Sequence, residues 1–183
     1  MVGPTNFMPS ALRSFDMRSA IPEVLAGLPS VEHAVVIGGS QDEAYASWEE
    51  WSSTPGIFNP VALPFDHPGF ILFSSGTTGA PKCIVHSAAG VMLKDLVEQR
   101  VHLDIREDDR VCYYTTTGWM MWNWLVMALG TGAAIVLYDG QPMYPTTTRL
   151  LDLAGSEGLT FLGVSAKYIE SLREKSVSAT RSQ

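Results

Sequence analysis

Short apolar runs alternate with stretches of helical periodicity along most of the chain. Apolar runs bounded by glycine, proline or polar residues are typical of buried strands, and strands that alternate with helices are typical of parallel sheets. The pattern therefore predicts an α/β fold with one or more mainly parallel sheets flanked by helices. The expected strands cover residues 33–37, 70–73 (buried), 84–86, 111–114, 133–138 and 160–164.

Several helix starts are marked by side chains that favour the first turn. Pro22 suits the first turn of a short helix, and Ser47-Trp48-Glu49-Glu50 has the form of a capping box. After Ser87, a plausible N-cap, the spacing of Met92, Leu96 and Val97 predicts that they share one helix face. The remaining helices are expected over 119–129, from Pro145 to near Gly155 or Gly158, and from Ser165 to about Glu174.

The stretch Thr115–Tyr138 contains no charged residue and is long enough to span a bilayer. It also contains Asn123 and the sequence Gly130-Thr131-Gly132, which is typical of a turn. We therefore interpret it as a buried helix, a turn and a buried strand over Ala133–Tyr138, in preference to a membrane-spanning helix.

Composition narrows the class of protein. The chain has 183 residues and a formal net charge of −7, so nucleic acid is not an expected partner. Cys83 and Cys112 match no metal-ligand or redox spacing and are expected to be reduced thiols of a cytoplasmic protein. The N-terminus lacks the pattern of a secretory signal. We expect a disordered leader over 1–14, an irregular proline-rich connection over 54–68 and a disordered tail over 176–183.

The sharpest chemical feature is the segment Ser74–Lys82, which directly follows the apolar run 70–73. Glycines let backbone N–H groups approach an anion, and hydroxyl groups can donate to phosphate oxygens. Lys82 adds a mobile positive charge, and Pro81 stiffens the chain beside it. The separation of Gly79 from Lys82 excludes the common P-loop, in which glycine directly precedes lysine. These residues indicate a polyphosphate cradle, and a polar hairpin loop of the same composition is the alternative.

The string from Phe73 to Lys82 resembles the phosphate-binding signature of the adenylate-forming superfamily, which includes acyl-CoA synthetases, luciferases and peptide-synthetase adenylation domains. Four further segments are similar to the acetoacetyl-CoA synthetase branch, namely 28–31, 82–87, 116–124 and 132–140. The resemblance runs from about residue 15 to residue 175. It implies a partial AMP-binding (adenylation) domain that forms part of the large N-terminal domain of such an enzyme.

This resemblance implies a reaction in two steps. A short carboxylic or 3-oxo acid and ATP give an acyl-adenylate and pyrophosphate, and the acyl group then passes to the thiol of coenzyme A. Oriented donors in the loop would stabilise the negative charge of the leaving pyrophosphate. Mg²⁺ would share that task, although no acidic pair marks its ligands and no residue is assigned to it. The implied phosphate contacts are Thr77, Thr78, Gly79 and Lys82, with Ser74, Ser75 and Gly76 shaping the loop.

The resemblance also places the segment around Gly118–Trp124 at the acyl pocket and the coenzyme A tunnel. Trp119, Met120 and Met121 are the implied acyl contacts. The alternative is that these apolar side chains are plain core, as aromatic and methionine residues on buried helices commonly are.

Other polar residues favour structural interpretations. His86 lies near the loop in sequence, and a structural histidine is favoured over a phosphate contact. The charged run Asp104–Asp109, followed by Arg110, is interpreted as a solvated surface loop.

The chain is shorter than the family pattern. The adenine and ribose motifs and the small C-terminal domain with its catalytic lysine are missing, so we expect the chain alone to be inactive. Unpaired strand edges and an exposed apolar face predict self-association. Two alternatives remain: a truncated protein that binds a nucleotide or a partner without catalysis, and a non-functional truncated reading frame.

Overall fold

The structure is a computed structural model that describes residues 20–37, 45–53, 55–74 and 79–177. The expected leader (1–14) and most of the expected tail lie outside these residues. The chain divides into two compact units, Met1–Val61 and Ala62–Gln183, which are described separately. The fold is α/β, as the alternation of apolar runs predicts.

The first unit contains two short helices and a two-stranded parallel sheet. Helix α1 (Ile21–Ala26) has its proline in the first turn, as predicted. Strand β1 (Val35–Val36) pairs with β2 (Ala46–Ser47). Helix α2 (Trp48–Ser53) begins at the predicted capping box, where the backbone N–H of Glu50 donates to Ser47 Oγ at 3.1 Å. The described residues 55–67 that follow contain no helix or strand, as the prolines predict.

The second unit begins with an antiparallel hairpin of β3 (Pro68–Ser74) and β4 (Lys82–Ser87). The register opposes Ile71 to Val85 and Phe73 to Cys83, so these four side chains share one face. The expectation that residues 70–73 are buried is wrong, because Ile71 is 59% exposed and Phe73 is 71% exposed. Among the described residues β3 and β4 pair only with each other, and α3 packs on the hairpin without covering this face.

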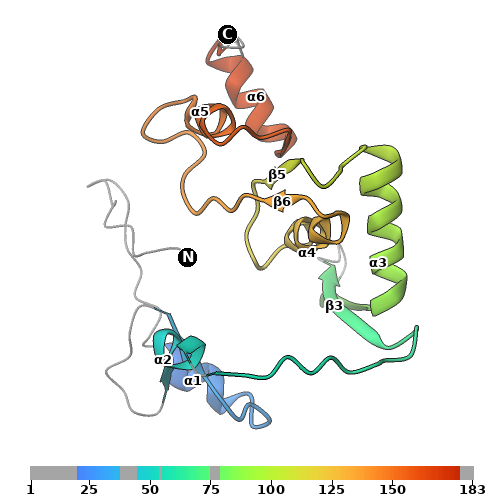
Figure 1. Ribbon diagram of the computed structural model, residues 1–183. Coiled ribbons are helices and arrows are strands. Elements are labelled where there is room, and N and C mark those ends of the chain that lie inside the picture. The colour runs from blue at the N-terminus through green and yellow to red at the C-terminus, as the bar shows by residue number, and fades with distance from the viewer. Residues whose placement is uncertain (1–19, 38–44, 54, 75–78, 178–183) are drawn as a thin grey trace. The chain divides into compact units, whose positions relative to one another are not determined.

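Helix α3 (Ala88–Val97) follows the hairpin and continues as a π-helical segment, η2 (Glu98–His102). Ser87 occupies the predicted N-cap position, but its side chain makes no capping hydrogen bond within the described residues. The residues predicted to share one face are not its buried side: Met92 and Val97 are about half exposed and Leu96 is half-buried. The buried positions are instead Asp95 and Gln99, one turn apart. Polar side chains therefore face the interior, and Figure 1 shows α3 beside α4, the helix that they approach.

A three-stranded parallel sheet in the order β6–β5–β7 forms the rest of the second unit. Its strands are β5 (Arg110–Tyr113), β6 (Ala134–Ile135) and β7 (Phe161–Gly163). Gly163 is required in β7, because a Cβ there would lie 2.1 Å from the Tyr113 ring. The predicted parallel arrangement is confirmed, although β6 is shorter than the expected run 133–138.

Two connections join these strands. Helix α4 (Met120–Met127) and the 3₁₀ segment η3 (Ala128–Thr131) link β5 to β6 through a turn in which Gly132 has φ +92°. The predicted order of helix, turn and strand is therefore confirmed, but the predicted burial is only partial, since Trp119, Leu129 and Leu137 are more than half exposed. No described helix is long and apolar enough to cross a membrane. Helix α5 (Arg149–Ser156) starts later than predicted, because the hydroxyls of Thr146 and Thr148 bond the Asp152 carboxylate in a turn before it.

The core of the second unit lies between α4 and the parallel sheet. Its side chains are almost fully buried: Ile105, Val111, Trp124, Leu125, Ala128 and Ala133. The Trp124 ring packs 5.9 Å from Tyr113 and 5.7 Å from Phe161, centroid to centroid. The last helix, α6 (Ala166–Glu174), has the predicted cap, in which Ser165 Oγ accepts from the backbone N–H of Tyr168 at 3.2 Å.

Candidate functional site

The β3–β4 hairpin carries the predicted phosphate loop at its open end. Ser74 and Lys82 are the last cross-strand pair before the loop. Ser75, Gly76, Thr77 and Thr78 lie outside the described residues. Gly79, the next described loop residue, is exposed, and a Cβ there would meet nothing within 4 Å. The hairpin thus brings Lys82, a predicted phosphate contact, and Ser74, a predicted loop-shaping residue, together at the base of the loop.

The paired positions of Ser74 and Lys82 have a chemical consequence. Directly opposed residues of an antiparallel pair have Cβ atoms about 5 Å apart and project from the same face. Ser74 is half-buried and offers a hydroxyl, whereas Lys82 is exposed and offers an ammonium group on a long stem. One short donor and one mobile cation at the base of a loop of small residues suit an anion with several oxygens.

His86 lies at the other end of the hairpin, opposite Phe70 and four residues along β4 from Lys82. At about 3.4 Å per residue the Cα atoms are about 14 Å apart, which favours the structural interpretation of His86. Its charged neighbour is Asp95 of α3. Burial raises the pKa of the Asp95 carboxyl, a hydrogen bond from Lys94 opposes that shift, and attraction to His86 is the smallest opposing effect.

The predicted acyl contacts lie at the start of α4, just after the carboxyl end of β5. Trp119 occupies the N-cap position and is 56% exposed, and Met120 is 48% exposed. Met121 is half-buried and packs against the core cluster, to which Trp124 belongs. Two of the three predicted contacts are therefore open to solvent, while Trp124 is plain core.

Two tyrosines near this region were not singled out from the sequence. The Tyr114 hydroxyl donates to the Gly140 carbonyl oxygen at 3.1 Å, and the Tyr138 hydroxyl donates to the Gln141 carbonyl oxygen at 3.0 Å. Both lie just beyond the carboxyl ends of parallel strands, where α/β proteins commonly bind ligands. Their positions as the last residues of two predicted strands could have identified them.

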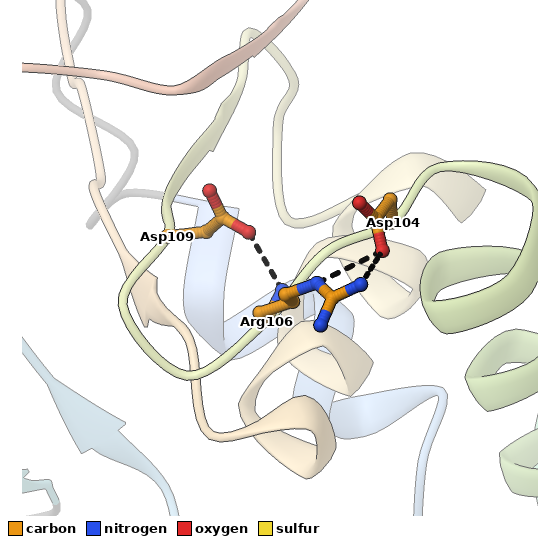
Figure 2. A network of polar contacts seen from close by, with 3 residues as sticks. All are labelled: Asp104, Arg106 and Asp109. Carbon is orange, nitrogen blue, oxygen red and sulfur yellow. Dashed lines mark hydrogen bonds and ion pairs between the residues drawn. The ribbon is translucent and has the colours of Figure 1, made fainter.

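The predicted charge cluster before β5 is a structured turn, shown in Figure 2. The Arg106 guanidinium pairs with Asp104 Oδ1 at 2.7 Å, and the Arg106 backbone N–H donates to Asp109 Oδ2 at 2.6 Å. Hydrogen bonds from the Thr160 side chain and the Arg106 backbone lower the pKa of the Asp109 carboxyl. Asp104 and Arg106 are both exposed, so the interpretation as a solvated surface loop is confirmed.

Metal-ligating side chains do not gather in the part of the chain that the structure describes. No group of three or more His, Cys, Asp and Glu residues is placed there to hold an ion. Cys83 is exposed on the hairpin and Cys112 is buried in β5, and burial raises the pKa of the Cys112 thiol. The donors at the hairpin are a hydroxyl and an ammonium group, which suit phosphate oxygens and not a divalent cation.

The fold and the hairpin together define an α/β domain that presents a loop of anion-binding composition. A family model described as AMP-binding enzyme matches residues 10–182, and the chain belongs to that family.

The chain is similar to three acetoacetyl-CoA synthetases, two compared by sequence and one by structure. The chain is 52% identical over 179 residues to acetoacetyl-CoA synthetase of Danio rerio, covering 89% of this chain and 26% of the relative. It is 56% identical over 115 residues to that of Gallus gallus, covering 63% of this chain and 17% of the relative. The solved acetoacetyl-CoA synthetase from Streptomyces lividans has a TM-score of 0.82 and 39% identity, covering 88% of this chain and 26% of that structure. The chain thus spans about a quarter of these relatives' length, or less.

Proposed function

We propose that this chain supplies the ATP-phosphate loop and part of the acyl pocket of an acid–CoA ligase that activates a short 3-oxo acid such as acetoacetate. The observation that carries the proposal is the Ser74–Lys82 pair, which closes the base of the predicted loop on a hairpin. Similarity to the solved acetoacetyl-CoA synthetase from Streptomyces lividans and to the Danio rerio sequence supports the same assignment.

In this proposal the loop binds the β- and γ-phosphates of ATP. Lys82 places its ammonium group against the phosphate oxygens, and the hydroxyl and backbone N–H groups of the loop orient them. The acid's carboxylate then attacks the α-phosphorus, an acyl-adenylate forms and pyrophosphate leaves. Donors fixed before the reaction stabilise the charge on that leaving group. Mg²⁺ would enter with the nucleotide, and none of the described residues is assigned to it.

The acid would lie against Trp119, Met120 and Met121. Two of these are exposed next to the carboxyl end of β5, where a small ligand can reach them, and Met121 connects them to the core. Coenzyme A would approach the same region to accept the acyl group. We further propose that the 183 residues alone bind the phosphates weakly and do not complete the ligation, since the relatives that they resemble are about four times longer.

A chimera tests this function. The chain replaces the matching segment of the Danio rerio acetoacetyl-CoA synthetase, to which it is 52% identical over 179 residues. Pyrophosphate release is measured with acetoacetate and with acetate. We expect release that depends on acetoacetate and falls by about two orders of magnitude in Lys82→Ala, the scale at which removal of one transition-state donor acts.

The matched control is Lys167→Ala, which removes an exposed lysine of α6 and should leave release unchanged. A folded chimera that is active with Lys82→Ala would contradict the phosphate role. Preference for acetate would contradict the choice of acid and leave the phosphate role standing.

A further inference from the structure

Gln99 is a polar side chain fully buried in the second unit, and no role has been assigned to it above. It lies in the π-helical segment η2, and π-helical turns occur frequently at functional sites. Its side-chain Nε2 donates to the backbone carbonyl oxygen of Trp124 in α4, at 2.8 Å. Gln99 thus joins the end of α3 to the middle of the helix that carries the predicted acyl contacts.

This hydrogen bond satisfies the carbonyl oxygen of Trp124, which does not accept from the Ala128 N–H within α4. In a continuing α-helix the N–H of Ala128 would donate to the carbonyl of Trp124, four residues earlier. Here α4 tightens into the 3₁₀ segment η3, and the Ala128 N–H is directed at the carbonyls of Leu125 and Val126. The Gln99 amide donates to the Trp124 carbonyl in place of the Ala128 N–H. A buried carbonyl without such a donor would carry a desolvation cost.

Gln99 is itself held in place by the core. Its backbone carbonyl accepts from the N–H of Ile105 at 2.8 Å, and Ile105 belongs to the same core cluster as Trp124. From Trp124 the connection to the acyl contacts is one helical turn, because residues three and four apart lie on the same face of a helix. Met121 packs on that cluster, and Met120 is its exposed neighbour.

We propose that Gln99 is a positioning residue for acid recognition: by holding the Trp124 carbonyl it fixes where α4 places Met120 and Met121. The proposal rests on the proposed function, since it assumes that the start of α4 contacts the acid. Gln99 touches neither ATP nor acid in this account. Its loss should therefore move acid binding while leaving phosphate binding unchanged.

The test compares Gln99→Met, which keeps the length and removes the donor, with Gln99→His, which can present an N–H at a similar distance. The control Arg100→Met removes another bond to a backbone carbonyl, from Arg100 Nη2 to Thr131 at 2.7 Å, beyond the end of α4. Each purified chain is labelled with ¹³C at the methionine methyl groups. Spectra are recorded alone, during acetoacetate titration and during ATP titration.

We expect Gln99→Met to shift the Met120 and Met121 methyl signals and to weaken acetoacetate binding by about tenfold, with ATP affinity changed less than about twofold. Gln99→His should restore both, and Arg100→Met should change neither. Unmoved methyl signals in Gln99→Met, or equal loss of acid and ATP binding, would overturn the proposal.

Two other outcomes are covered: Gln99→Met does not fold, or the unmodified chain does not bind acetoacetate. If Gln99→Met does not fold, Gln99→Asn replaces it, because its shorter amide must draw α4 closer or lose the bond, and the same shifts are expected. If the unmodified chain binds no acetoacetate, the assumption that its own α4 suffices to bind the acid fails by itself, apart from the positioning. Methyl signals of the free chains that shift in Gln99→Met and return in Gln99→His then still support the positioning of α4, and unmoved signals refute it.

Discussion

The β3–β4 hairpin and the β6–β5–β7 sheet belong to the same unit and differ in how they are covered. The parallel sheet packs against α4, and its central strand contains the fully buried Val111. The hairpin has an equally apolar strand, yet Phe73 on it is 71% exposed. The residues predicted to bind phosphate belong to the poorly covered element, and the well-covered element supports the predicted acyl contacts. The apolar content of a strand alone therefore does not tell whether the strand is buried.

The largest expected effect separates the two regions by stability. Leu125→Ala removes a side chain that is 1% exposed and should lower the free energy of unfolding by about 3 kcal/mol. Phe73→Ala removes an exposed ring and should cost less than about 1 kcal/mol. Urea unfolding followed by circular dichroism measures both. Equal losses of unfolding free energy in the two variants would show that the hairpin face is covered in solution. The difference in burial between the hairpin and the parallel sheet would then not hold.

A second prediction concerns what the exposed hairpin face does in solution. The face formed by Ile71, Phe73, Cys83 and Val85 is apolar and should promote self-association. Phe73→Lys should weaken that association about tenfold, or about 1.4 kcal/mol, in sedimentation velocity over a range of concentrations. The control Val101→Lys places the same charge at an exposed apolar position of η2. The idea fails if both variants associate as the unmodified chain does.

The smallest expected effect lies at the buried carboxyl of α3. Because burial raises the pKa of Asp95 above its ordinary value of 3.8, the folded chain binds this proton more tightly than the unfolded chain. Burial thus disfavours the charged Asp95 carboxylate at pH 7. The free energy of unfolding should rise as the pH falls through the pKa that Asp95 has in the folded chain. The ion pair with Lys94 offsets little of this cost of burying the charged carboxylate, since the Lys94 ammonium group is exposed.

Asp95→Asn should therefore increase the free energy of unfolding at pH 7, by no more than about 1 kcal/mol, and the gain should shrink toward pH 4. Urea unfolding at several pH values measures the difference between the two chains. A loss of stability at pH 7 that shrinks toward pH 4 would contradict this, because it would mean that hydrogen bonds stabilise the carboxylate more than burial opposes it.

Much of the local structure could be predicted from the sequence, because local side chains determine it. The capping residues Ser47 and Ser165 act at the predicted helix starts, and Gly132 makes the predicted turn. Burial could not be predicted in the same way, since it depends on what packs on an element. For that reason the prediction that the strand over 70–73 is buried is wrong, since Ile71 and Phe73 are exposed.

The periodicity of α3 does not tell which of its sides is buried. The spacing of Met92 and Val97 predicts a shared face, but both are about half exposed, and the residue that bonds α4 is Gln99 in η2. The reason is the change of α4 from α to 3₁₀ geometry, after which the Trp124 carbonyl accepts from the Gln99 side chain and not from the Ala128 N–H. No pattern within α3 encodes that event, because it takes place in a different helix. The predicted phosphate contacts Thr77 and Thr78 and the loop-shaping residues Ser75 and Gly76 lie outside the described residues, and their roles stay predictions.

The central claim is that the hairpin loop binds the phosphates of ATP, and an isothermal titration of ATP into the purified chain tests it most directly. We expect weak binding that falls by about tenfold or more in Lys82→Ala, as for a lost charge-assisted hydrogen bond, and that is unchanged in Lys167→Ala. Equal binding by the unmodified chain and Lys82→Ala, in folded samples, would contradict it.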